Sequence, residues 1–350
     1  MDFLVDYNIE SLADTLAAAG EKRVHAGRIL RQYYESNGQI DWTAISVSRA
    51  AQRFVENLGG RRSQIGFRHE AADGTIKLLL DFVGGGMTET VLMPAYRNEF
   101  AAGCVSSQIG CAMGCDFCAS TQNGLERDLL SGEIVEQFLH LKTEAAAQNR
   151  RLKTLVFMGM GEPLLNFENV TAAIERIADP DIGGLGWRQV TVSTVGIVPG
   201  IDRLADLDWN IHLALSLHAP DDATRSRLVP SNRRYPVAEV MDAAKRFLEK
   251  TGRTPNIEYC LIQNVNDSIE QALLLAELMR GFRAHVNVIP YNAIGAARSG
   301  KVYERPSREC LNQFVDTLRN NGVVCHVREA RGDDVNAACG QLRRRLMVVS

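Results

Sequence analysis

Residues 104–121 read CVSSQIGCAMGCDFCAST, a short apolar run that leads into a glycine-containing loop with three closely spaced cysteines. Cys111, Cys115 and Cys118 form a C-x3-C-x2-C pattern, which lets one loop wrap a compact inorganic group. A four-iron cluster held by three protein thiolates keeps one iron open to an external ligand, whereas an electron-transfer cluster normally takes four cysteines. The spacing therefore predicts an iron–sulfur site with one open iron.

Structural zinc is the alternative for these thiols, with Cys104 as the fourth ligand. Closed zinc sites favour paired C-x2-C arms, of which this loop offers one. The chain has eight cysteines in 350 residues, too few for a disulfide scaffold, so the clustered cysteines are expected to bind metal or to react. We therefore favour iron–sulfur and keep zinc as its rival.

Short apolar, β-branched runs alternate with helical stretches from Cys104 onward, which favours a parallel α/β sheet or barrel. Six such units are too few for an eight-fold barrel and suit a partial one, with polar residues at the strand ends where these folds place their sites. We expect one α/β catalytic domain, a partial (β/α)6 barrel, over residues 99–350. The runs are CVSSQ from 104, TLVFMGM from 154, QVTVSTVG from 189, IHLALSLHA from 211, NIEYCLI from 256 and HVNVIPYN from 285.

The first hundred residues follow two other patterns. Residues 9–58 carry apolar side chains at helical spacing, which predicts a small helical accessory domain over residues 1–60. Residues 63–94 are β-rich runs separated by Ala-Asp-Gly and Gly-Gly-Gly, which predict a short antiparallel extension over residues 61–98. Near the other end, a loop is expected to open a helix close to Asp333 or Asp334.

The composition excludes several classes of protein. No apolar run approaches the roughly 18 residues of a membrane span, and acidic residues stand near the start, where a secretory signal is basic. The formal net charge of −3 gives no sign of a non-specific polyanion binder, so any nucleic-acid surface has to be local. We expect a cytoplasmic monomer with no membrane partner.

Further segments occur in a fixed order along the chain: MGMGEPLLN, VSTVG, LSLHAP, HVNVIPYN and RGDDVNAACGQL. Together with the cysteine loop they resemble the RlmN-type RNA adenine C2-methyltransferases of the radical-SAM superfamily, over close to the whole chain. The resemblance implies a radical-SAM barrel and one [4Fe–4S] cluster on Cys111, Cys115 and Cys118. It also implies S-adenosyl-L-methionine (SAM) as the second cofactor.

The resemblance assigns the other SAM contacts to residues at or beyond strand ends. Gly161 and Glu162 of GMGEP would bind the amino group of SAM, since a carboxylate can receive a ligand ammonium. Without the resemblance, GMGEP is a tight turn and a lone strand-end histidine is a satisfied structural residue. The remaining pocket residues implied are Ser193, Ser216, Leu217, His218 and Asn292.

A two-step reaction is implied, because the electron-poor C2 carbon of adenine cannot attack the methyl group of SAM directly. Cys339 would first take a methyl group from one SAM, and a second SAM would be split to a 5′-deoxyadenosyl radical that activates this methyl group. Glu89 would accept the C2 proton, and Cys104 would release the product and form a disulfide with Cys339. By pattern alone, Glu89 is an exposed strand residue and both cysteines are small buried hydrophobes.

The implied substrates are an adenosine in the peptidyl-transferase centre of 23S rRNA and the adenosine 3′ of the anticodon in some tRNAs, with a flavodoxin- or ferredoxin-type electron donor. The basic N-terminal helices, with Arg28 and Arg31 beside Tyr33 and Tyr34, are the candidate RNA platform. Two alternatives stay open. One is a sister enzyme of the Cfr type that methylates adenine C8, and the other is a non-catalytic, zinc-stabilised RNA-binding protein.

Overall fold

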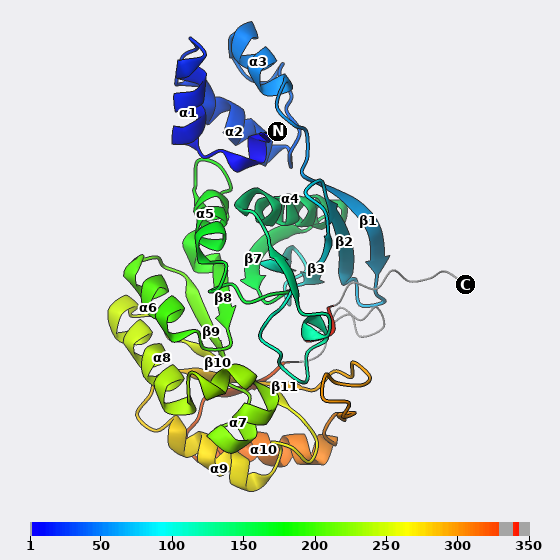
Figure 1. Cartoon of the computed structure of the whole chain (residues 1–350), viewed down its shortest axis with the longest axis vertical. Helices are drawn as coiled ribbons and strands as arrows, with labels where there is room; N and C mark the ends of the chain where they lie inside the picture. Colours follow the sequence, from blue (N-terminus) through cyan, green and yellow to red (C-terminus); the bar gives the residue numbers. More distant parts are fainter. Residues whose placement is uncertain (1, 329–338, 343–350) are drawn as a thin grey trace, which may run out of the picture.

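The computed structural model describes residues 2–328 and 339–342. Within these residues, ten strands form one large sheet, and two short strands pair separately (Figure 1). In spatial order the large sheet contains β1 (Ser63–Glu70), β2 (Ile76–Phe82), β3 (Met87–Pro94), β4 (Phe100–Cys104), β7 (Arg151–Phe157), β8 (Val190–Thr194), β9 (His212–Ser216), β10 (Asn256–Leu261), β11 (His285–Pro290) and β12 (Cys325–Val327). The separate pair is β5 (Gln108–Gly110) and β6 (Leu125–Asp128).

In the large sheet, β4, β7, β8, β9, β10, β11 and β12 pair in parallel one after another, so the predicted partial α/β barrel is confirmed. The first predicted run was misplaced, because the strand covers FAAGC and ends at Cys104 instead of beginning there. Beyond Cys104 the chain leaves the ladder, and the amides of Ser107 and Gln108 bond to the carbonyl of Met160. β12 was not predicted, since three residues are too short to show a period.

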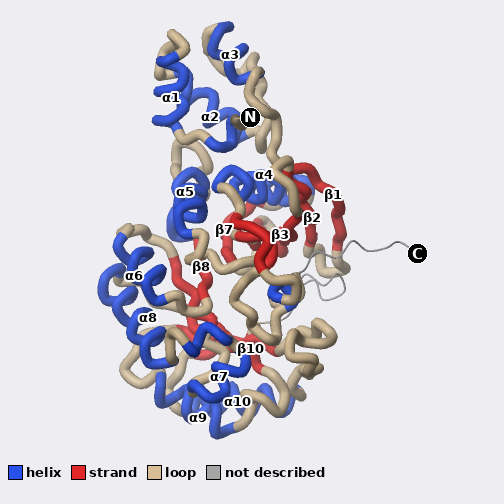
Figure 2. Tube along the Cα trace, in the orientation of Figure 1, coloured by secondary structure: helices blue, strands red, loops and turns tan. Residues whose placement is uncertain are grey.

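Helices connect the parallel strands and cover the outside of the sheet (Figure 2). Several begin at a side chain that accepts a hydrogen bond from the first turn, as Asp221, Ser268 and Ser307 do. The helices of this region are α4 (Ser131–Ala147), α5 (Phe167–Ala178), α6 (Val198–Asp206), α7 (Asp222–Leu228), α8 (Val237–Thr251), α9 (Ile269–Leu278) and α10 (Arg308–Asn320). Short 3-10 turns occur at Ala119–Thr121, Trp187–Gln189 and Pro230–Arg233.

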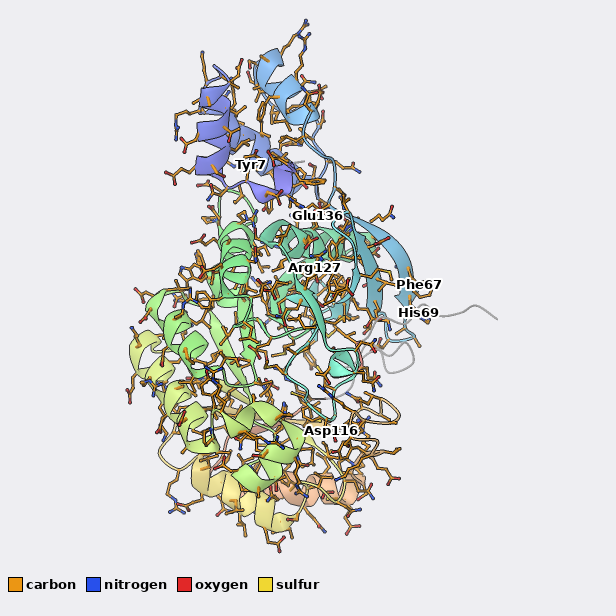
Figure 3. The ribbon with its side chains drawn as sticks, viewed as in Figure 1. Tyr7, Phe67, His69, Asp116, Arg127 and Glu136 are labelled. Atoms are coloured by element: carbon orange, nitrogen blue, oxygen red, sulfur yellow. The ribbon has the colours of Figure 1, made fainter. Side chains whose placement is uncertain are left out.

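The antiparallel extension predicted before the barrel is present and continues the same sheet. β1 pairs with β2, β2 with β3, and β3 with β4, all antiparallel. The last pairing sets Val91 opposite Cys104, so the extension reaches the end of the first barrel strand. Glu136 of α4 fixes the start of β1 by accepting hydrogen bonds from the Arg62 amide and the Ser63 hydroxyl (Figure 3).

Three N-terminal helices are present as the spacing predicts: α1 (Ile9–Ala18), α2 (His25–Glu35) and α3 (Arg49–Glu56), preceded by a 3-10 turn at Leu4–Asp6. They lie at one end of the molecule, beside α4 and α5 (Figure 1). Lys142 of α4 donates to the carbonyl of Tyr34, and Arg176 of α5 donates to the carbonyl of Val5. Their apolar side chains belong to the same core as the first half of the barrel. The division at residues 60 and 98 stays a prediction.

The proposed aromatic part of the RNA platform is wrong. Tyr33 and Tyr34 are buried at 3% and 0% exposure, so neither ring is available to stack on a base. Arg31 is also engaged, because it forms an ion pair with Asp181. The helical spacing of these tyrosines is that of the apolar face of a helix, which packs against the core.

The helix expected near Asp333 lies outside the described residues. Among the residues that the structure covers, we find no helix with the length and apolar character that crossing a membrane requires.

A buried leucine tests the attachment of the N-terminal helices. Leu16 of α1 is fully buried in the shared core, so Leu16→Ala is expected to lower the free energy of unfolding by about 2–5 kcal/mol. The control Leu274→Ala removes a side chain of α9 that is 49% exposed, and a change within about 0.5 kcal/mol is expected. Denaturant unfolding measures both, and equal losses would contradict the shared core.

Candidate active site

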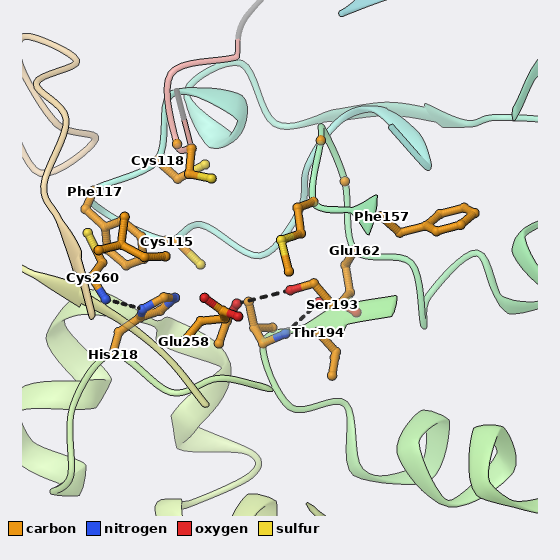
Figure 4. Close-up of a pocket in the computed structure, with 18 of the residues that line it drawn as sticks. Cys115, Phe117, Cys118, Phe157, Glu162, Ser193, Thr194, His218, Glu258 and Cys260 are labelled. Atoms are coloured by element: carbon orange, nitrogen blue, oxygen red, sulfur yellow. Dashed lines mark hydrogen bonds between the residues drawn. The ribbon is translucent and has the colours of Figure 1, made fainter. Parts of the chain in front are cut away.

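The carboxyl ends of the parallel strands open into a cavity of about 150 Å³, which we call the inner cavity (Figure 4). Its lining residues come from several strands of the barrel, from the cysteine loop and from the segment that carries Cys339. Its lining includes Cys115, Phe117, Cys118, Met158, Gly161, Glu162, Ser193, Val195, Ser216, His218, Glu258, Ile289, Cys339 and Gly340.

The turn after β7 lies tightly against the segment that leads to the cysteine loop. Gly161 has a φ of +102°, and a Cβ built there would stand 2.6 Å from the Cβ of Gln108. Only glycine tolerates both this backbone conformation and this approach. The side-chain oxygen of Gln108 accepts a hydrogen bond of 2.8 Å from the amide of Glu162, which fixes the turn against the loop.

The Glu162 carboxylate is held by backbone amides from two directions. One oxygen accepts from Leu164 at 3.1 Å and the other from Val195 at 2.9 Å, while the side chain is almost fully buried. Burial raises the pKa of Glu162 to about 7, and the two amide hydrogen bonds oppose that rise. A buried carboxylate at a cavity wall is suited to an ammonium group of a ligand.

The three cysteines of the loop lie close enough for their charges to interact, and Cys115 and Cys118 reach the inner cavity. Burial raises the pKa of the Cys111 thiol to about 12, and the charges of Cys118 and Glu162 raise it further. Burial also raises the pKa values of Cys115 and Cys118. Three anionic thiolates in this setting require a positively charged partner.

Asp116 anchors this loop to a distant part of the chain and was missed in the sequence. Its carboxylate accepts hydrogen bonds from the Ser299 amide at 2.8 Å, the Ser299 hydroxyl at 2.6 Å and the Tyr303 hydroxyl at 2.6 Å (Figure 3). Its own amide donates to the carbonyl of Leu228. The loop is therefore fixed at its middle, between Cys115 and Cys118.

No three His, Cys, Asp or Glu side chains of the described residues come together closely enough to bind a single metal ion. A four-iron cluster makes a different demand, because each protein thiolate binds a different iron atom. Cys111 and Cys115 are buried, and Cys118 is partly buried. Three thiols in a short loop beside a cavity with space for an external ligand fit that demand.

Arg225, at the centre of the strand ends, is a second functional candidate that the sequence did not reveal. Its guanidinium is fully buried and donates to the carbonyls of Leu217 at 3.0 Å and Val195 at 2.6 Å, and to the side chain of Asn232 at 2.8 Å. Burial lowers its pKa to about 10, and the neighbouring Cys115 opposes that fall. The cation thus ties β8 to β9 and stands next to the cysteine loop.

His218 combines a structural bond with a place in the cavity. Its Nδ1 accepts a 3.0 Å hydrogen bond from the Cys260 amide, and its ring packs edge-on against Phe117 at 4.7 Å. Burial lowers the pKa of His218 to about 3, with Arg225 adding to the effect, so the ring is neutral and carries its proton on Nε2. His218 is therefore a hydrogen-bonded structural residue that also lines the inner cavity, and its contact with SAM stays a prediction.

The other implied SAM residues fall in three different places. Ser193 and Ser216 both line the inner cavity, and their hydroxyls are hydrogen bonded to each other at 3.4 Å. Leu217 is buried in the core, and its amide and carbonyl are both hydrogen bonded. Asn292 lies at the edge of a second cavity, where its amide group donates to the carbonyl of Cys339 at 3.2 Å.

The segment that carries Cys339 is fastened to the turn just after the cysteine loop. The Ala119 amide donates to the carbonyl of Gly340 at 2.8 Å, and the Ser120 hydroxyl donates to the carbonyl of Leu342 at 2.7 Å. These bonds bring a residue near the end of the chain to the wall of the inner cavity.

Cys104 and Cys339 line a second, larger cavity of about 630 Å³, which we call the outer cavity. Burial raises the pKa of Cys104, and the charge of the nearby Cys339 raises it further. Cys339 lies on the wall of both cavities, as do Met158 and Ile289. A thiol in this position has access to ligands on either side.

Glu89 is buried at 3% exposure on β3, so the pattern-based alternative of an exposed strand residue is wrong. Its carboxylate lies 3.3 Å from the ammonium of Lys77. Because side chains alternate along a strand, Glu89 points to the same face as Val91, which packs with Cys104. Among the described residues, Glu89 lies outside the linings of both cavities.

Comparison with known proteins agrees with this geometry. Residues 105–276 match the model of the radical SAM superfamily. A probable dual-specificity RNA methyltransferase RlmN 1 of Opitutus terrae is 52% identical over 97% of this chain and 96% of its own. The corresponding RlmN of Symbiobacterium thermophilum is 42% identical over 97% of this chain and 90% of its own. The chain belongs to the RlmN family of radical SAM enzymes.

A solved structure supports the same assignment at the level of the fold. A radical SAM methyltransferase from Sphaerobacter thermophilus superposes with a TM-score of 0.91 at 40% identity, covering 98% of this chain and 99% of its own. As a member of the radical SAM superfamily, the chain is an enzyme that uses SAM and a [4Fe–4S] cluster.

Replacing Arg225 tests whether this cation organises the strand ends. Arg225→Leu leaves buried carbonyls without donors, so a loss of about 3 kcal/mol or more in unfolding free energy is expected. Arg227 lies on the same helix but is exposed, and Arg227→Leu is expected to change stability by no more than about 0.5 kcal/mol. Thermal or denaturant unfolding compares the two, and a mild effect at position 225 would refute the assignment.

Proposed function

We propose that the chain methylates C2 of adenosine in RNA, in the peptidyl-transferase centre of 23S rRNA and 3′ of the anticodon in tRNA. The printed names of its relatives, dual-specificity RNA methyltransferases, support the substrate class. The single observation that carries the chemistry is the position of Cys339 on the walls of both cavities. A residue that carries a methyl group from SAM to RNA needs access to both.

In this proposal the inner cavity binds SAM and the cysteine loop holds the cluster. Cys111, Cys115 and Cys118 are the ligands, and Glu162 binds the amino group of SAM through a charge-assisted hydrogen bond. The reduced cluster supplies the electron that splits SAM. Gly161, Ser193, Ser216 and His218 line this cavity and supply further contacts to SAM. Leu217 and Asn292 lie outside its lining, so the resemblance alone supports them as SAM contacts.

The protein side chains then divide the work of methyl transfer. Cys339 accepts a methyl group from one SAM as a nucleophile, and this methyl group is later activated and added to C2. Glu89 accepts the C2 proton, which is consistent with a buried carboxylate on the face of β3 that packs near Cys104. Cys104 then attacks the thioether, frees the methylated RNA and forms a disulfide with Cys339.

The enzyme acts in the cytoplasm as a monomer in this proposal, and a flavodoxin- or ferredoxin-type protein reduces the cluster. RNA reaches the outer cavity, where the adenine has to be presented outside its stack. Tyr96 at the rim is fully exposed and is a candidate stacking partner for the RNA. A C8-methylating enzyme would use the same residues, so the position of the new methyl group decides between the two.

Loss of the carrier thiol tests the reaction. Cys339→Ser is expected to abolish RNA methylation, because serine does not replace the thiolate as a methyl acceptor. Mass spectrometry of nucleosides from RNA incubated with enzyme, SAM and reductant measures 2-methyladenosine and 8-methyladenosine separately. Cys310→Ser, a half-buried cysteine on α10, is the control and is expected to keep activity. Methylated RNA from Cys339→Ser would refute the proposal, and 8-methyladenosine from wild type would move it to the C8 enzyme.

The assignment of Glu162 has its own test. Glu162→Gln keeps the hydrogen-bonding shape but removes the charge, so the dissociation constant of SAM is expected to rise at least about tenfold. Equilibrium dialysis of the cluster-containing protein with labelled SAM measures this constant. Unchanged binding would exclude Glu162 as the partner of the ammonium group.

A further inference from the structure

Glu258 is a second buried carboxylate of the inner cavity that none of the sequence motifs singled out. It lies on β10, between the strands that carry Ser216 and Asn287, and is 3% exposed. Figure 4 shows its carboxylate projecting into the cavity between His218 and Ser193. Cys339 lines the same cavity.

One oxygen of this carboxylate accepts a hydrogen bond from a neighbouring strand, and the other has no hydrogen-bond partner among the described residues. Oε1 accepts a 2.8 Å hydrogen bond from the Asn287 side chain and lies 3.7 Å from the guanidinium of Arg328. Oε2 is buried and has no hydrogen-bond partner among the described residues. An unpaired buried carboxylate oxygen is costly and rare in folded proteins, which points to a role in binding or chemistry.

Cys339 is a neighbouring group that needs a proton acceptor. A thiol has to lose its proton when its sulfur is methylated, and Cys339 lines the same cavity as Glu258. The same thiol experiences the charges of Glu258 and Arg328, with opposite effects. Both charged groups therefore lie in its immediate electrostatic environment.

We propose that Oε2 of Glu258 accepts the thiol proton of Cys339 as Cys339 takes its methyl group from SAM. This rests on the proposed function, in which Cys339 is the methyl carrier. The S–H bond of Cys339 breaks and its electron pair forms the new S–CH3 bond. The bond between the methyl group and the SAM sulfonium breaks, and its electron pair stays on sulfur to give neutral S-adenosyl-homocysteine. The proton passes to Glu258.

Asn287 and Arg328 hold Oε1 and so direct Oε2 toward the cavity. Glu258 and Glu89 thus serve different protons in different steps. Glu258 acts on the thiol before RNA is methylated, and Glu89 acts on C2 of the RNA base. Glu162, the other carboxylate of the inner cavity, accepts one backbone amide on each oxygen, which leaves a lone pair on each for the ammonium group of SAM.

The test isolates the first methyl transfer, which needs no electron. Anaerobic protein with its cluster is mixed with SAM in the absence of reductant and RNA, and the reaction is stopped at a series of times. Mass spectrometry of the peptide that contains Cys339 follows the gain of one methyl group. The variants are Glu258→Gln, Glu258→Asp and, as a matched substitution in the same cavity, Glu162→Gln.

Glu258→Gln is expected to slow methylation of Cys339 about 100-fold at saturating SAM, with the dissociation constant of SAM unchanged. Glu258→Asp should recover part of the rate because it restores a proton acceptor. Glu162→Gln should weaken SAM binding, which shows how a binding defect differs in this assay from loss of the proton acceptor. Equal rates for wild type and Glu258→Gln would overturn the inference, as would a defect of Glu258→Gln that lies only in SAM binding. If wild-type protein gains no methyl group at Cys339, that result would contradict the proposed function itself.

Discussion

The shared direction of the parallel strands is the constraint on which the rest of the site depends. Because strands β7 to β11 all end at one edge, the residues that follow them converge although they are far apart in the sequence. Side-chain hydrogen bonds also fix the positions of these residues. Arg225 ties the ends of β8 and β9 together, and Gln108 fixes the turn that carries Glu162.

Charge balance inside this site follows from burial. The Cys115 thiol and two carboxylates, Glu162 and Glu258, are buried around one cavity, where each negative charge is costly. Backbone amides stabilise Glu162, while Arg225 stands beside Cys115 and Arg328 beside Glu258. A ligand that brings a sulfonium and an ammonium group adds the positive charge that such a cavity favours.

Much of the fold and part of the site could be predicted from the sequence, for physical reasons. Buried parallel strands leave short apolar runs, and the spacing of Cys111, Cys115 and Cys118 reflects the geometry of one loop. Glu258 and Arg225 could not be predicted, since each lies within an ordinary strand or helix and gains its role only from neighbours distant in sequence. Tyr33 and Tyr34 were wrongly predicted to contact RNA, because aromatic residues at helical spacing beside arginines occur in a buried core as well as on a binding surface.

Electron paramagnetic resonance of the reduced, cluster-containing protein tests the central claim most directly, since that claim is an iron cluster with one site open to SAM beside Cys339. The account predicts about four iron atoms per chain and a spectrum that changes when SAM is added, because SAM then occupies the open iron. A protein that holds zinc and gives no signal would contradict the account. A cluster signal that SAM leaves unchanged would contradict it as well.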